Sequence, residues 1–272
     1  MLNRALDLDP ENVDAMVTQA MLKLYLEHDL QGSISAFESL IRRFPNSGAY
    51  HGYYEVLAIA LNTDEMLDVA ERIHALDPRS TSSAINEFNA HFVVGDFDRA
   101  RRALEHIPLD PIDEDAVWTG RKYWLTLADI ASGRFDAAED NIKSLSAERQ
   151  PYFLMWIAIE RGEVVDARAF YASTSKRISA MPWYWLPLDV VLTDDTSRTL
   201  DELENRADPG SIIWIMRLRA QEHWTAEHAA PAFRQAFAAL QQEPRYQQAL
   251  RKYGIDDESL AKIQVHTDEL WD

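Results

Sequence analysis

The chain has 272 residues, 47% of them apolar, and carries 45 acidic against 27 basic residues, for a formal net charge of −18. That charge repels phosphate, so we do not expect this chain to bind nucleic acid or an anionic membrane. Cysteine is absent, which excludes disulfides and thiolate sites and is compatible with a cytoplasmic location. The longest apolar runs, 152–159 and 181–188, are too short to cross a bilayer.

Apolar residues recur at helical spacing, and turn residues divide them into short helices that come in pairs. Prolines at 10, 45, 78 and 111 mark a period of about 33 residues, which is typical of a solenoid of helical units. We expect pairs at 13–28 and 31–43, 48–61 and 64–76, 81–94 and 97–107, 114–131 and 135–146, and 151–161 and 164–175. Beyond 176 the period weakens, and we expect helices at 178–192, 196–206, 211–224, 232–242 and 245–253.

The two ends of the chain differ from this pattern. Residues 1–10 are interpreted as a truncated first repeat, in which the end of the repeat's second helix is present and its first helix is missing. Because so short a helix is not stable alone, we expect the chain to be a piece of a longer protein. We divide the chain into a repeat region at 1–243 and a C-terminal capping helix with an acidic tail at 244–272. In that tail we expect one turn of helix followed by frayed residues.

A short motif repeats at the turn inside three of the pairs. A glycine allows the tight reversal, the side chain two residues later fills the gap at the turn, and a small residue lets the paired helix approach. The motif residues are Gly95, Phe97 and Ala100, then Gly133, Phe135 and Ala138, then Gly162, Val164 and Ala167.

These positions, together with the prolines that end the second helices, resemble the tetratricopeptide repeat. The resemblance covers 2–175 well and 176–243 loosely, although the first helices lack the family's usual Trp, Gly and Tyr set. It implies an all-α fold, a right-handed superhelical solenoid of antiparallel helix pairs. It also implies a non-enzymatic scaffold that holds a protein or peptide in its concave groove.

A second resemblance lies near the C-terminus. Residues 237–240 and 243–255 look like the closing segment of repeat domains that follow a winged-helix DNA-binding domain or a nucleotide cyclase in bacterial one-component regulators. This implies a cytoplasmic interaction or sensor module at the C-terminal end of a transcriptional or signalling regulator. Two alternatives stay open: a free-standing scaffold or adaptor, and, less favoured, an enzyme on a helical-repeat shell.

The sequence offers weak candidates for chemistry. His223 and Glu227 stand four residues apart, but ordinary surface residues account for them better than a metal pair does. Carboxylate clusters at 110–115, 194–195 and 256–258 lie beside helix starts, where capping explains them better than calcium binding. We therefore expect no catalytic residues, no metal and no cofactor.

Aromatic and polar residues on the first helices are the better candidates, because these helices line the concave side of such a solenoid. The residues we expect in the groove are His51, Glu55, Asn89, Tyr123, Trp183 and Trp185. The competing interpretation is that most of the aromatic residues fill the core between helices. The expected partner is a protein or peptide, with a small-molecule signal or a second copy of the chain as further possibilities.

Overall fold

The computed structural model describes residues 2–105, 107, 120–147, 149–173, 186–205 and 228–270, and within these ranges every regular element is a helix. The expected all-α class is therefore confirmed for the described part of the chain. The helices are α1 (Leu2–Leu8), α2 (Val13–Tyr25), α3 (Leu30–Arg43), α4 (Ala49–Ile59), α5 (Thr63–Leu76), α6 (Thr81–Val93), α7 (Phe97–Ala103), α8 (Arg121–Ala131), α9 (Phe135–Ile142), α10 (Gln150–Glu160), α11 (Val164–Ser173), α12 (Leu186–Thr193), α13 (Thr196–Asn205), α15 (Pro231–Gln242), α16 (Pro244–Lys252), α17 (Asp257–Leu260) and the 3₁₀ helix η2 (Thr267–Leu270).

Each helix packs mainly on the helices that precede and follow it, from α1 to α12. The helices expected between 13 and 173 begin and end within a few residues of their predicted bounds. The N-terminal part of the helix expected at 114–131, the first half of the one at 178–192 and the whole of the one at 211–224 lie outside the described residues. The apolar faces of the described helices meet in one continuous core.

The turn inside each pair is built in the same way. The predicted turn glycines Gly95, Gly133 and Gly162 have φ values of +78°, +73° and +83°, in the left-handed region that favours glycine. At all three turns the amide after the glycine donates to the carbonyl oxygen five residues earlier, at a distance of 2.8 or 2.9 Å. This six-to-one bond defines the Schellman motif, which ends a helix and reverses the chain.

Three further turns place a non-glycine residue in the same left-handed region. His28, Leu61 and Asp194 have φ values of +57°, +57° and +58°, and they lie between α2 and α3, α4 and α5, and α12 and α13. These six turns therefore share a residue in the left-handed region, although the sequence motif marks only three of them. A non-glycine residue in the left-handed region is strained, and the packing of the two helices on either side offsets this cost.

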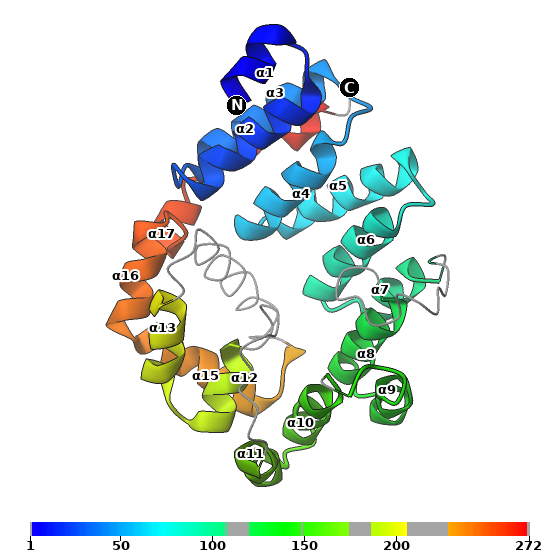
Figure 1. The fold of residues 1–272 in the computed structure, drawn as a ribbon, viewed down its shortest axis with the longest axis vertical. Coiled ribbons are helices and arrows are strands. Elements are labelled where there is room, and N and C mark those ends of the chain that lie inside the picture. Colours follow the sequence, from blue (N-terminus) through cyan, green and yellow to red (C-terminus); the bar gives the residue numbers. More distant parts are fainter. Residues whose placement is uncertain are drawn as a thin grey trace.

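The described helices follow one another around a ring, with α16 and α17 returning beside α2 (Figure 1). In this view α8 and α10 lie nearer the centre of the ring than their partners α9 and α11. The succession of helix pairs thus bends back on itself, so that the end of the described chain meets its beginning.

Direct bonds join the last described residues to α3. The side chain of Gln31 bonds twice with the backbone of Gln264, donating to its carbonyl oxygen at 3.0 Å and accepting from its amide at 2.7 Å. Glu38, which is 2% exposed, accepts a hydrogen bond of 2.8 Å from the amide of His266. The expectation of a frayed tail is wrong, because these bonds hold the segment against α3.

Apolar contacts support the same closure. The ring of His28 meets the edge of Tyr253, with the ring centroids 4.8 Å apart and the planes at 84°. Ile255, two residues further along the chain, is fully buried. Burying such side chains between the first pair and the last helices stabilises the closed form by removing apolar area from water.

A second long-range contact joins the start of α15 to the turn between α6 and α7. The ring of His228 packs edge-on against Phe97, with the centroids 5.8 Å apart. A Cβ added at Gly95 would overlap the imidazole ring of His228. Gly95 is therefore required twice, for its positive φ and for the close approach of this histidine.

None of the helices in the described ranges has both the length and the apolar character needed to cross a membrane.

Gly133 allows the turn conformation to be tested alone, because a Cβ at this position would meet no atom within 4 Å. We expect Gly133→Ala to lower the free energy of unfolding by about 1 kcal/mol through backbone strain only. Gly133→Asn is the matched control and should cost less, because asparagine tolerates the left-handed region. Equal stability of the alanine variant and the unsubstituted chain in urea unfolding would contradict this assignment.

Candidate functional site

Polar side chains connect the first helices of three successive pairs. Nδ1 of His51 on α4 lies 3.0 Å from Nδ2 of Asn86 on α6, and the hydroxyl of Tyr25 on α2 donates to Glu55 on α4 at 2.5 Å. Asn89 is half-buried and stands one turn beyond Asn86 on the same helix. We call these five residues the polar row. Three of the predicted groove residues, His51, Glu55 and Asn89, belong to it.

The polar row supplies hydrogen bonds and one carboxylate. Burial lowers the pKa of His51, and this effect outweighs the opposing influence of Asp77. The imidazole is therefore neutral near pH 7 and acts as a hydrogen-bonding group. Such a surface suits the amide groups of a peptide.

The structure does not bring Tyr123 to the polar row. Its side chain is fully buried, with its ring 5.3 Å from Trp124 and 5.4 Å from Phe153, both in edge-to-face arrangements. The ring therefore packs between α8 and α10, where it has no surface to offer a partner. For Tyr123 the groove expectation is corrected, and the competing core interpretation applies. Trp183 and Trp185 lie outside the described residues.

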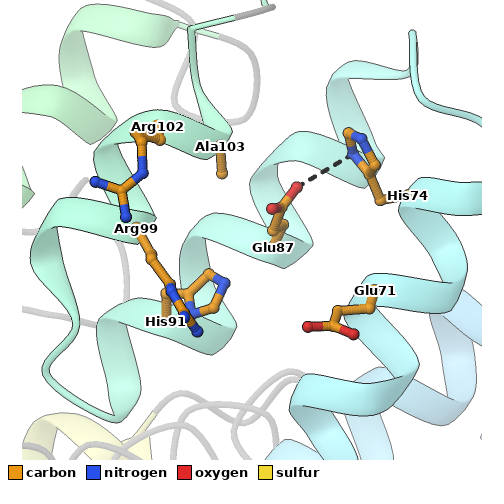
Figure 2. A pocket seen from close by; sticks show the side chains of 7 residues that line it. All are labelled: Glu71, His74, Glu87, His91, Arg99, Arg102 and Ala103. Atoms are coloured by element: carbon orange, nitrogen blue, oxygen red, sulfur yellow. Dashed lines mark ion pairs between the residues drawn. The ribbon is translucent and has the colours of Figure 1, made fainter.

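A pocket of about 380 Å³ opens between α5, α6 and α7 (Figure 2). Its lining residues are Glu71, His74, Glu87, His91, Arg99, Arg102 and Ala103. All but Ala103 carry ionisable side chains, so the pocket is unusually rich in charge. Its volume falls in the range of small-molecule sites, although such sites are normally more apolar.

Helical spacing places these side chains in the pocket. Glu71 and His74 are three residues apart on α5, and Glu87 and His91 are four apart on α6. Each pair therefore shares a helix face, as do the two arginines on α7. Because α6 packs on both α5 and α7, the three faces meet.

Some of the ionisable groups in the pocket contact a neighbouring ionisable group. Nδ1 of His74 lies 3.1 Å from Oε2 of Glu87, across the boundary between α5 and α6. Nε of Arg99 lies 3.4 Å from Oδ2 of Asp96, the residue that caps α7. Each of these pairs is partly exposed, so it contributes little to stability.

His91 is buried in the pocket wall, with 6% of its surface exposed. Burial lowers its pKa more than the nearby carboxylates of Asp96 and Glu87 raise it. The imidazole is therefore neutral near pH 7 and presents one hydrogen-bond donor and one acceptor. The pocket can bind a ligand through hydrogen bonds and charge.

This pocket was not among the sites expected from the sequence. The available signal was three successive helices that each carry two ionisable residues at a spacing of three or four. Helix spacing alone does not show which faces meet, and a charged face is more often simply solvated. The pocket could be identified only once the structure showed how α5, α6 and α7 pack together.

Two of the three carboxylate clusters contain helix caps. Oδ1 of Asp195 accepts from the amide of Arg198 at 3.0 Å, and Oδ1 of Asp256 accepts from the amide of Ser259 at 3.2 Å. The capping interpretation is therefore confirmed at both positions. The cluster at 110–115 and the pair His223 and Glu227 lie outside the described residues. Within the described ranges, no group of three His, Asp or Glu residues is arranged to hold a metal ion.

No protein-family model matches the chain, and no curated protein matches it significantly. The resemblances to tetratricopeptide repeats and to bacterial regulators therefore stay predictions.

Tyr123 provides a direct test of the core assignment. Its buried hydroxyl has no hydrogen-bond partner among the described residues, so Tyr123→Phe should leave the free energy of unfolding unchanged or slightly raised. Tyr123→Ala empties a packed aromatic site and should cost about 3–5 kcal/mol. Thermal and urea unfolding measure both. A melting temperature unaffected by the alanine substitution would instead place the ring at the surface.

Proposed function

We propose that this chain is a non-enzymatic binding module that holds a protein or peptide partner along its first helices. The observation that supports this most directly is the polar row, in which side chains from α2, α4 and α6 are joined across helix boundaries. A row of neutral hydrogen-bonding groups with one carboxylate can satisfy the backbone of an extended peptide. The net charge of −18 favours a partner that is basic.

The proposal includes the architecture that the sequence motif implies. The helix pairs would form a right-handed solenoid of the tetratricopeptide kind, and the shared turn geometry supports that interpretation. The chain would work in the cytoplasm as the C-terminal module of a transcriptional or signalling regulator. Occupancy of the polar row would then be transmitted to the effector domain as a change in curvature.

A free-standing scaffold or adaptor is the alternative. It uses the same polar row but has no effector domain, so the two proposals differ in the native gene. A winged helix or a cyclase encoded upstream supports the regulator, whereas a start codon at Met1 supports the scaffold. An enzyme on a helical-repeat shell is the least favoured alternative, because the sequence contains no recognised nucleophile or metal motif.

The test places a long cationic side chain in the polar row. We expect Asn89→Lys to reduce recovery of the cellular partner at least about tenfold in quantitative affinity purification, because it blocks the row and repels a basic partner. The control is Ala137→Lys, which adds the same charge at an exposed position of α9 on the outer side of the ring (Figure 1).

Both variants should keep the melting temperature of the unsubstituted chain, since neither position is in the core. A partner recovered equally by both variants would show that binding does not use the polar row. The proposal would also fail if the unsubstituted chain recovered no specific partner.

A further inference from the structure

The pocket between α5, α6 and α7 has two charges of opposite sign that no described residue neutralises. Glu71 on α5 is exposed and forms no ion pair with another described residue, and the same is true of Arg102 on α7. They line one pocket but do not pair with each other. An unpaired acid and an unpaired base thus lie within one volume of about 380 Å³.

The charges are separated by helix. Acidic side chains come from α5 and α6, whereas both arginines come from α7. Figure 2 shows the carboxylate of Glu71 directed toward the side of the pocket where His91 and Arg99 lie. A ligand in the gap therefore meets a carboxylate on one side and guanidinium groups on the other.

We propose that this pocket binds a small zwitterion, with a cationic group toward Glu71 and an anionic group toward Arg102, as in an ω-amino acid with a charge at each end of its carbon chain. The inference goes beyond the proposed function, because it adds a small-molecule ligand at a second site to a module proposed to hold a protein or peptide. The anionic end is a carboxylate or a comparable oxyanion, which guanidinium groups bind in bidentate geometry.

Ligands with a single charge fit this arrangement less well. An anion attracted by the arginines also approaches the carboxylates of Glu71 and Glu87, and a cation meets the opposite conflict. A zwitterion satisfies both sides at once and adds no net charge to the pocket. His91 then contributes a hydrogen bond from the wall without adding a third charge to be balanced.

The test compares probes that share one carbon chain and differ only in charge. ε-Aminocaproate carries both charges, whereas hexanoate and hexylamine each carry one. Isothermal titration calorimetry at low ionic strength should show ε-aminocaproate binding at least about tenfold more tightly than either analogue. γ-Aminobutyrate is a shorter zwitterion, so the two zwitterions together test two distances between the cationic and anionic groups.

Matched substitutions assign the binding to the pocket. Glu71→Gln and Arg102→Gln should each weaken the tighter zwitterion about tenfold. Asp68→Asn and Arg72→Gln make the same changes in charge at exposed positions of α5 outside the pocket lining, and should leave the affinity unchanged. All four positions are on the surface, so the melting temperature should not change.

Two results would overturn the proposal. One is that neither zwitterion binds more tightly than the singly charged analogues, and the other is that the pocket substitutions leave the affinity unaltered. Both can be distinguished from failure of the proposed function. An effect of Asn89→Lys on the protein partner, without zwitterion binding, would reject the pocket assignment alone. Zwitterion binding without a protein partner would retain the pocket and reject the polar row.

Discussion

The ring depends on the burial of one carboxylate, Glu38. A buried carboxylate is costly unless hydrogen bonds replace its water. Tyr53 on α4 donates one such bond at 3.3 Å, and the amide of His266 donates another at 2.8 Å. The C-terminal segment therefore completes the environment of a side chain in the first helix pair. Closure and the stability of that pair are linked, because releasing the segment would leave Glu38 short of a donor.

Two other buried carboxylates connect neighbouring helices in the same way. Asp129 on α8 is fully buried, accepts from Arg101 and Asn141, and so connects α7, α8 and α9. Asp189 on α12 is 8% exposed and accepts from Thr199 on α13 at 3.0 Å. In each case a carboxylate from one helix is satisfied by groups on its neighbours. These bonds fix how successive helices are oriented, whereas the apolar core supplies most of the free energy of burial.

Local features of the sequence were sufficient for the bounds of most described helices and for the turns at Gly95, Gly133 and Gly162. Gly95 predicts its turn because glycine is the residue that adopts a positive φ without strain. Leu61 gives no such signal, since its left-handed conformation is imposed by the two helices that it joins. Tyr123 illustrates a different limit. An aromatic residue on a first helix fits a groove and a core equally well, and only the packing of α8 on α10 decides between them.

The ring and the pocket could not have been predicted in this way, because both depend on residues far apart in the chain or on different helices. Gln31 and Gln264 are separated by 233 positions, and the acidic and basic sides of the pocket come from three helices. Helical periodicity contains no information about such pairings. The closing bonds depend on how the first and last described helices meet, and the pocket depends on how α6 packs on α5 and α7.

Double electron–electron resonance tests the closed ring most directly. The chain has no cysteine, so spin labels attach only at two introduced positions, both of which are exposed. They are Ser39→Cys on α3 and Gln264→Cys between α17 and η2. A closed ring predicts one short, narrow distribution of distances between the labels. A broad distribution at long distances would contradict it and would describe an open array whose last residues are free of α3.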